Sequence, residues 1–527
     1  MRIHLRNPHA ETQRRKEENK GFFSPPWFGV FARAIFIVLL LVPMALNAQE
    51  GFGSDDEGFG DFGDFGFGDS SGGFGFPPSS ASALPSVSIS GEVSAELIGF
   101  YDDFGSCEKL KYLKAGDIFS GDLNFEASGS AAQAVINLKL TPVFDGSSSP
   151  LEIDEAYVRA FFGPVAITGG LRKLSWGKAD SFGPLDVVNP LDYTDLTKLS
   201  DPPGIKIARP MIHASWAMGP FSKLEAVFVP WFQGHKFATT GRWAPGQVTS
   251  IPGSTADYAA KAFTAKTGLI LPDSEKKRIT GTMEDWIDSG AVDKFYPDTA
   301  FFKYAQAGMR FTASVGSSDF GFQYYFGRLP RPVVAFRAGD NFYTGAAVNT
   351  DEISIDIGYN YYHQIGADFA RVIAGFNLRA EAGVNLTKDT NGTNGAAENP
   401  AIVWSLGFDR DLFAGINLNL QGTGKVRLLN DQIGDNPLAD CEAETDISST
   451  RITGKLSRKF FRDELELKIS GLWGIEDRDF LVMPAIVWTR NDVSTELSGG
   501  FFGGDKKGEL GQYRDNGFIR VILTYRF

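Results

Sequence analysis

The sequence predicts an all-β fold: a transmembrane antiparallel up-and-down β-barrel of about 18 strands (16–18), preceded by a disordered N-terminal segment. Three observations lead to this fold class. Apolar and polar residues alternate from Ser86 onward with the period of two that is typical of strands. The connections between the alternating segments are short and long in turn. The chain also ends on an apolar strand, "GFIRVILTYRF".

The composition favours β-structure and excludes several classes of function. The chain has 527 residues, among them 60 Gly, 45 Phe and only 2 Cys. Glycine and aromatic residues in this abundance are typical of strands joined by tight turns. The formal net charge of −13 provides no basic surface for nucleic acid. Two cysteines are too few for a zinc cluster or a disulfide framework.

Residues 1–48 have the pattern of a secretory signal peptide. A basic region that includes Arg14 and Arg15 precedes the apolar run 34–46, and Ala48 is a small residue suited to a cleavage site. The alternative is an uncleaved membrane anchor, but the run is shorter than the ~20 residues of a spanning helix. We therefore expect cleavage.

Residues 49–85 form a low-complexity segment of repeated Phe-Gly with Asp between the repeats. The segment contains seven acidic residues and no basic ones. Its glycines and like charges oppose a packed core, so we expect disorder. Two roles remain open: a solvated tether, or a docking segment whose phenylalanines bind a periplasmic partner or the inside of a pore.

The alternating segments have the length of strands that cross a bilayer, about 10 residues. In the first of them, Val87, Ile89 and Val93 share one face, and the other face is polar. Further segments of this kind include 119–128, 132–140, 304–313, 353–362, 376–386 and 465–473.

The connections fall into two classes that alternate along the chain. The short ones lie near Gly129 and at 163–164, 219–220, 316–319 and 490–492, and the long ones at 174–206, 233–300, 329–350, 388–399 and 429–448. Transmembrane barrels show this asymmetry, whereas a soluble sandwich has no reason to sort its loops in this way. We therefore expect a barrel over residues 86–527, with both termini in the periplasm and the long loops outside the cell.

The last eleven residues resemble the assembly signal of bacterial outer-membrane barrels. The matching residues are Gly517, Tyr525 and the final Phe527. The resemblance implies an outer-membrane location and recognition by the barrel-insertion machinery. It also implies that the last strand pairs with the first, so that its apolar face meets lipid.

The stretch 154–196 resembles porin-like outer-membrane families, and matches best a family of mostly uncharacterised outer-membrane barrels. The matching residues are Glu155, Ala156, Tyr157, Arg172, Trp176, Gly177, Asn189, Pro190 and Asp192. The loop that follows Trp176 is long and rich in Asp and Pro. Two conformations remain open for it: an inward fold that constricts the barrel, or a cap on the surface.

If the apolar face of each strand meets lipid, a set of charged side chains lines the lumen. Acids gather on the first two strands and bases on the next four, an arrangement that produces a transverse field favouring polar and charged solutes. The alternative is that these charges pair and stiffen the wall. The residues are Glu92, Glu96, Asp122, Glu126, Arg159, Arg172, Arg209, His213, Arg310, Arg379 and Arg520.

The tripeptide His213-Ala214-Ser215 resembles the His-x-Ser pair of outer-membrane phospholipases, in which histidine activates a serine nucleophile. Such a pair must face its lipid substrate. Here both side chains fall on the same face as Arg209, which is the lumen face. We therefore expect no enzyme activity, and the sequence predicts no cofactor and no metal site.

These observations predict a channel for passive diffusion of small polar solutes, since a barrel of this size is wide enough for water. Two alternatives remain: a transporter of hydrophobic or amphiphilic molecules, and a surface barrel that binds a ligand or acts as an adhesin. Association into a homotrimer is compatible with each. Cys107 and Cys441 both fall in predicted outer loops, where the compartment permits a disulfide.

Overall fold

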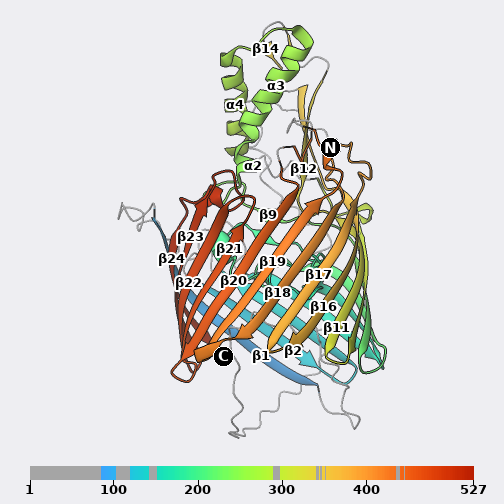
Figure 1. The fold of residues 1–527 in the computed structure, drawn as a ribbon, viewed down its shortest axis with the longest axis vertical. Helices are drawn as coiled ribbons and strands as arrows, with labels where there is room; N and C mark the ends of the chain where they lie inside the picture. The colour runs from blue at the N-terminus through green and yellow to red at the C-terminus, as the bar shows by residue number, and fades with distance from the viewer. Residues whose placement is uncertain are drawn as a thin grey trace, which may run out of the picture. The chain divides into compact units, whose positions relative to one another are not determined.

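The alternating segments form one antiparallel sheet that closes on itself (Figure 1). Among the residues that the structure describes, this sheet has 18 strands, each paired with its neighbours along the chain. The barrel strands are β1 (Ser86–Phe100), β2 (Phe119–Ser128), β3 (Ala132–Leu140), β4 (Leu151–Phe162), β5 (Val165–Arg172), β7 (Arg209–Ala217), β8 (Ser222–Val229), β10 (Gln306–Val315), β11 (Ser318–Arg328), β16 (Tyr361–Ile373), β17 (Phe376–Thr387), β18 (Ala401–Asp411), β19 (Ile416–Arg427), β20 (Ser448–Phe460), β21 (Leu465–Gly474), β22 (Asp479–Arg490), β23 (Val493–Gly504) and β24 (Phe518–Arg526).

The structure is a computed structural model, and it describes most of the barrel and its loops. The described residues are 85–101, 119–141, 151–288, 297–339, 343–344, 347–349, 352–434, 440–443 and 445–527. The predicted signal peptide (1–48), all but the last residue of the Phe-Gly segment (49–85) and Cys107 lie outside the described residues.

The predicted pairing of the first and last strands is confirmed. β24 pairs with β1 in antiparallel register from Phe518 opposite Phe100 to Arg526 opposite Glu92. The final residue completes this seam, because Phe527 and Gly91 exchange two backbone hydrogen bonds of 3.0 Å. The sheet therefore has no free edge between its first and last strands.

The two ends of the barrel differ in their connections. One end has short turns, such as 129–131, 163–164, 316–317 and 491–492, which agrees with the predicted set. The other end has long connections, among them 173–208, 230–305, 329–360, 388–400 and 428–447.

One predicted strand was wrong. The segment 353–362 was expected to cross the membrane, but β15 (Ile353–Gly358) pairs with β12 (Val333–Ala338) in a separate two-stranded sheet, and the barrel resumes only at Tyr361. The loop therefore runs to residue 360 rather than 350. A hairpin in a loop alternates like a barrel strand, so the period alone does not separate them.

The long connections carry the remaining elements. The connection between β8 and β10 contains helices α2 (Gly246–Thr249), α3 (Ile251–Thr267) and α4 (Asp273–Asp288), which lie beyond the long-loop end of the barrel (Figure 1). Within the described part of the chain, no helix is long and apolar enough to span a membrane. Two short pairs complete the fold: β6 (Asp192–Tyr193) with β9 (Lys236–Phe237), and β13 (Tyr343–Thr344) with β14 (Ala347–Val348).

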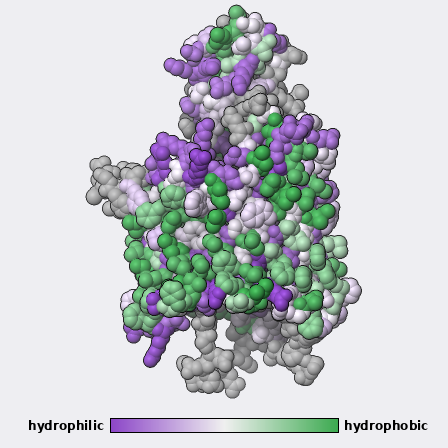
Figure 2. All heavy atoms as spheres, viewed as in Figure 1, coloured by the Kyte–Doolittle hydropathy of each residue, from purple (hydrophilic) through white to green (hydrophobic). Residues whose placement is uncertain are grey.

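The outward face of the barrel is apolar. Along β24, Val521, Leu523 and Tyr525 are 40%, 49% and 49% exposed. Figure 2 shows hydrophobic residues spread over the barrel wall and hydrophilic residues gathered over the helices beyond it. A continuous apolar exterior on a closed sheet is the surface that lipid solvates, and it explains why the alternation is so regular.

We expect the substitution Leu523→Arg to destabilise the barrel, because Leu523 lies on the outward face in the middle of β24. A lipid-facing Arg near the bilayer midplane costs about 2–4 kcal/mol. The measurement is urea unfolding in lipid vesicles, followed by tryptophan fluorescence. The matched control is Ser90→Arg, which places the same charge on the inward face of β1 and is expected to leave the unfolding free energy nearly unchanged. Equal losses in both variants would contradict the assignment of the two faces.

Candidate functional site

The connection between β5 and β7, residues 173–208, lies inside the barrel; we call it the inner loop. Its residue Leu185 is fully buried against the opposite wall, where a Cβ added to Gly366 would lie 2.4 Å from Leu185 Cδ2. The glycine on β16 therefore leaves the space that the leucine fills. Of the two conformations left open by the sequence, the inward constriction is the one observed.

A single carboxylate on β17 holds the middle of the inner loop. The side chain of Glu381 accepts hydrogen bonds from the backbone N–H groups of Lys178, Ala179 (2.7 Å) and Leu185 (3.3 Å). A Cβ at Gly177 would lie 2.2 Å from Glu381 Oε1, so only glycine permits this approach. The Glu381 carboxyl group thus supplies acceptors for three backbone N–H groups of the inner loop.

A second anchor combines Arg379 of β17 with two residues of β19. Arg379 forms ion pairs with Asp180 of the inner loop and with Asp409 of β18. Asn419 donates to the same Asp180 carboxylate (2.9 Å), and Gln421 Oε1 accepts from the Asp180 backbone N–H (2.8 Å). Arg379 is predicted to line the lumen, but here it is only 3% exposed because the loop covers it.

A third anchor consists of two glutamines on β11 and β16. Gln323 Nε2 donates to the carbonyl of Leu185 (2.8 Å), and Gln364 Nε2 donates to the carbonyl of Pro184 (2.9 Å). Behind them, Arg310 binds Gln323 (2.7 Å) and pairs with Asp368 (2.7 Å). Arg310 therefore supports the loop instead of contacting solvent.

The two ends of the inner loop are held together by Asn189. Its Oδ1 accepts from the backbone N–H of Leu174 (2.8 Å), and its Nδ2 donates to the carbonyls of Arg172 (3.0 Å) and Ile207 (2.8 Å). Asn189 belongs to the stretch that resembles porin-like families, and this geometry gives that residue a physical role.

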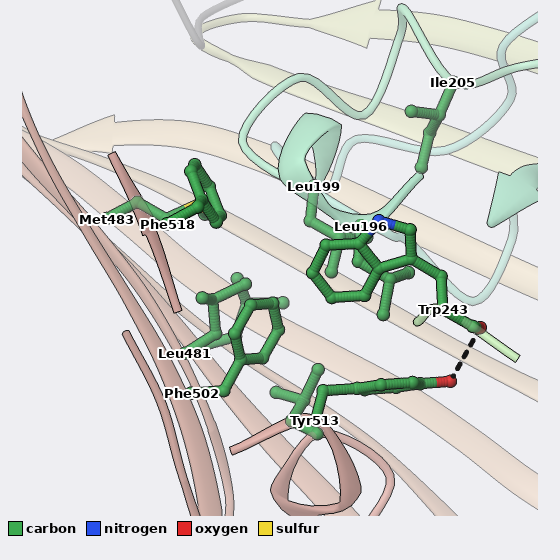
Figure 3. Packing of buried hydrophobic residues seen from close by; sticks show 11 residues of the cluster. Leu196, Leu199, Ile205, Trp243, Leu481, Met483, Phe502, Tyr513 and Phe518 are labelled. Atoms are coloured by element: carbon green, nitrogen blue, oxygen red, sulfur yellow. Dashed lines mark hydrogen bonds between the residues drawn. The ribbon is translucent and has the colours of Figure 1, made fainter. Parts of the chain in front are cut away.

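An apolar cluster attaches the remaining part of the inner loop to β22, β23 and β24 (Figure 3). Leu196 and Leu199 of the loop meet the inward side chains of Leu481, Phe502 and Phe518. Trp243 and Tyr513 come from other connections, and the Tyr513 hydroxyl donates to the Trp243 carbonyl (3.3 Å). The alternation of the sequence predicts that apolar side chains face lipid, so it does not reveal this inward-facing group.

Charged side chains on the inward face of β1–β4 are partly exposed, in contrast to those behind the inner loop. The side chains of Lys139 and Glu92 are 39% and 31% exposed, whereas those of Arg379 and Asp368 behind the loop are 3% and 0% exposed. All four lie on the inward face by strand register. The open space therefore lies between the inner loop and β1–β4.

The predicted acidic residues lie along this open wall. Glu92 pairs with Arg526 (3.3 Å), and Glu126 accepts from Ser128 (2.8 Å) and Gln133 (2.7 Å). Asp122 lies directly between Glu92 and Lys139 in the sheet register. Within the described residues, the carboxylates of Glu96 and Asp122 make no hydrogen bond or ion pair shorter than 4.0 Å.

The predicted basic residues divide between the open wall and the interior. Arg159 contacts Thr168 (3.4 Å) on the open side. Arg172 contacts His213 Nδ1 (3.0 Å), and His213 Nε2 lies 3.2 Å from Glu225. Two further basic residues are buried in the interior. Arg209 is 2% exposed and binds Gln233 (2.6 Å) and the Trp231 carbonyl. Arg520 pairs with Glu496 (3.3 Å).

The remaining predicted residues are placed as follows. Tyr525 and Phe527 lie on the outward face with their rings stacked at 6.2 Å, and Gly517 closely approaches Tyr101, whose ring a Cβ would meet at 2.4 Å. His213 and Ser215 point inward, on the face of Arg209. Cys441 is half-buried between β19 and β20, and since Cys107 is not described the disulfide stays a prediction.

The long loops are tied to one another above the inner loop. Glu509 forms ion pairs with Arg331 (2.7 Å) and Arg451 (2.8 Å). These two guanidinium groups hold the pKa of the Glu509 carboxyl well below its usual range. The contacts join the connections that follow β11 and β23 to the start of β20.

No family model and no curated protein matches the sequence. Several solved structures resemble this chain at low identity. OccAB4 of Acinetobacter baumannii has a TM-score of 0.43 and 7% identity, with 84% of this chain and 98% of that chain covered. The outer membrane channel DcaP of Acinetobacter baumannii has a TM-score of 0.36 and 10% identity, with 85% and 99% covered. Wzi of Escherichia coli, a carbohydrate-binding β-barrel, has a TM-score of 0.40 and 10% identity, with 83% and 84% covered.

We expect Glu381→Gln to loosen the inner loop. Glutamine keeps one acceptor oxygen but turns an N–H₂ group toward backbone donors, so at least one loop amide loses its partner. A hydrogen bond to a charged group contributes about 1.5–3 kcal/mol, so amide hydrogen exchange in residues 177–186 is expected to accelerate at least about tenfold. Exchange is measured by mass spectrometry on the folded protein in detergent.

The control for this experiment is Glu126→Gln, which removes an inward carboxylate that contacts only Ser128 and Gln133 among the described residues. It is expected to leave exchange in the inner loop unchanged. Parental exchange rates in Glu381→Gln would show that this carboxylate does not hold the loop.

Proposed function

We propose that the chain is an outer-membrane channel through which small polar solutes diffuse passively. The observation that carries this proposal is the water-exposed, charged wall of β1–β4 beside the inner loop. An 18-stranded barrel is wide enough for an aqueous passage unless loops fill it, and here the inner loop fills only one side. The passage is therefore narrow and polar.

The charges along the passage favour hydrated solutes. Acids lie on β1 and β2, and Lys139, Arg159 and Arg172 lie on β3, β4 and β5. Opposite charges on adjacent strands, surrounded by apolar material, create a field across the passage that orders water. Charge pairing accounts for part of this wall, because Lys139 and Lys173 both contact Asp154 (3.1 and 2.7 Å). Glu96 and Asp122 remain available to a solute.

The orientation belongs to the same proposal. The short turns face the periplasm and the long connections face the exterior, since export carries only one end of a barrel across the membrane. The insertion machinery reads Gly517, Tyr525 and Phe527. Residues 1–48 are removed on export, and residues 49–85 remain as a periplasmic segment.

The interior does not favour transport of hydrophobic molecules. Such a transporter needs an apolar pocket or an opening in the wall. The inward apolar residues of β22–β24 are packed by the inner loop, with Leu481 and Phe518 at 0% and 1% exposure. Among the described strands, each barrel strand pairs with both neighbours, so the wall has no lateral gap.

The test of this function is conductance of the purified protein in planar lipid bilayers. We expect ohmic steps that scale with salt concentration, and a second recording without residues 49–85 shows whether that segment occupies the pore. Silence of a preparation that is folded by circular dichroism would reject the channel. Deletion of residues 246–288, which contain α2, α3 and α4, tests whether a surface-binding role is separate from conduction.

We expect the double substitution Glu96→Gln and Asp122→Asn to lower the preference of the channel for cations. Attraction between unit charges at about 4 Å in water is about 1 kcal/mol, so the cation-to-anion permeability ratio is expected to fall roughly two- to fivefold. The ratio is obtained from the reversal potential in a potassium chloride gradient. The control is Asp463→Asn, a charge removed from a turn at the short-turn end, outside the passage. An unchanged ratio in the double variant would show that solutes do not pass these carboxylates.

A further inference from the structure

A cavity of about 210 Å³ lies between the inner loop and the long-loop ends of three barrel strands. Gln306 at the start of β10, Arg328 at the end of β11 and Tyr362 at the start of β16 form its outer wall. The inner loop supplies the opposite wall. No residue of β1–β4 lines the cavity. The cavity borders the apolar cluster described above, because Phe182, Leu191 and Tyr193 line it and also pack against that cluster.

Two glutamines offer hydrogen-bond donors to this cavity because their oxygens are already bonded. Gln306 is 4% exposed, and its Oε1 accepts from the Tyr325 hydroxyl (3.1 Å) and the Arg328 backbone N–H (3.2 Å). Gln233 Oε1 accepts from Arg209 (2.6 Å). Neither Nε2 group has a hydrogen-bond partner among the described residues, so both are available to a ligand.

His235 supplies a third donor. Its Nδ1 accepts from the backbone N–H of Leu191 (2.9 Å), which fixes the tautomer so that the hydrogen lies on Nε2. Burial lowers the pKa of His235 to about 3, so the ring is neutral at ordinary pH. Its backbone N–H donates to the carbonyl of Pro330 (2.9 Å), which holds the residue in place.

The charged groups that line the cavity are Lys206, Arg328 and Asp186. Lys206 pairs with Asp186 and also donates to Ser175 (2.5 Å). Arg328 donates to the backbone carbonyls of Tyr359 (2.6 Å) and Lys303 (3.3 Å). Asp186 therefore neutralises Lys206, whereas Arg328 has no carboxylate partner among the described residues and its guanidinium offers N–H groups to oxygen atoms. The Asp186 carboxylate can accept hydrogen bonds from hydroxyl groups.

The remaining walls are aromatic and fixed in place. Tyr193 stacks on Phe237 with ring centroids 5.5 Å apart and an interplanar angle of 14°. Phe232 packs edge-on against Tyr359 at 4.7 Å. Rigid aromatic surfaces bind apolar C–H groups with little loss of conformational entropy.

We propose that this cavity binds one neutral, oxygen-rich ring, the chemistry of a free monosaccharide. Three fixed N–H donors match ring and hydroxyl oxygens, and the aromatic walls match the C–H faces of a sugar. Its volume is below the roughly 300–1,000 Å³ of pockets for drug-sized ligands, which restricts it to about one ring. Its role as a loading site for solute rests on the proposed channel function, but the binding itself does not.

The experiment measures binding of D-glucose to the full chain in detergent by isothermal titration calorimetry, with benzoate as the charged aromatic comparison. We expect glucose to bind and benzoate not to compete with it. Gln233→Glu and Gln306→Glu keep the acceptor oxygens but remove the donors, and each is expected to weaken glucose binding about three- to tenfold. The matched control Gln247→Glu, at an exposed site on α2, is expected to bind as the parent does.

The proposal is overturned by binding of benzoate in place of glucose, or by glucose binding that neither cavity variant changes. Absence of glucose binding to the folded parent also overturns it. Conductance of the same variants separates this result from the channel function. An ohmic channel without glucose binding rejects only the cavity, whereas a silent bilayer with variant-sensitive glucose binding rejects only the channel.

Discussion

Closure of the sheet is the constraint on which the rest of this structure depends. In hydrocarbon, a backbone N–H or C=O group has no water to bind, so an open edge would be prohibitively costly. The seam between β1 and β24, completed by the paired hydrogen bonds of Gly91 and Phe527, removes that edge. Once the sheet is closed, an apolar exterior and a polar interior are both stable, and the alternation of the sequence follows from this arrangement.

Closure also creates an interior that strand side chains alone do not fill. The inner loop enters it and brings its backbone polar groups away from bulk water, where each needs a partner. Glu381, Gln421, Gln323 and Gln364 supply those partners from the far wall. The buried charges of Arg379 and Glu381 thus hold the inner loop in place.

The sequence contains much of the fold and less of the site. The strands Phe119–Ser128 and Ala132–Leu140 have the predicted bounds, because alternation and turn residues agree there. The inward direction of Arg310 and Arg379 also follows from alternation, but their burial does not. Burial depends on a loop about 200 residues away in the sequence, as in the contact of Arg379 with Asp180, and no local pattern records such a contact.

The apolar residues on the inward face also depend on contacts that the local sequence does not predict. Alternation in a barrel strand predicts that apolar side chains face lipid. Phe518 and Leu481 are apolar but face inward, so the local pattern does not predict their position. Their position becomes intelligible only when Leu196 and Leu199 are placed against them. Asn189, by contrast, belongs to the stretch that resembles porin-like families, so the sequence does single it out. Its three hydrogen bonds hold the two ends of the inner loop together.

The inner loop divides the interior unequally, and this division decides where charge can act. Polar anchors occupy β11–β19 and apolar packing occupies β22–β24, whereas charged side chains on the inward face of β1–β4, such as Lys139 and Glu92, stay partly exposed. A charge on that wall is screened by water and acts on passing solutes, whereas a charge behind the loop is committed to a partner. Selectivity in the proposed channel is therefore a consequence of which wall the loop leaves uncovered, and not of the total number of charged residues that point inward.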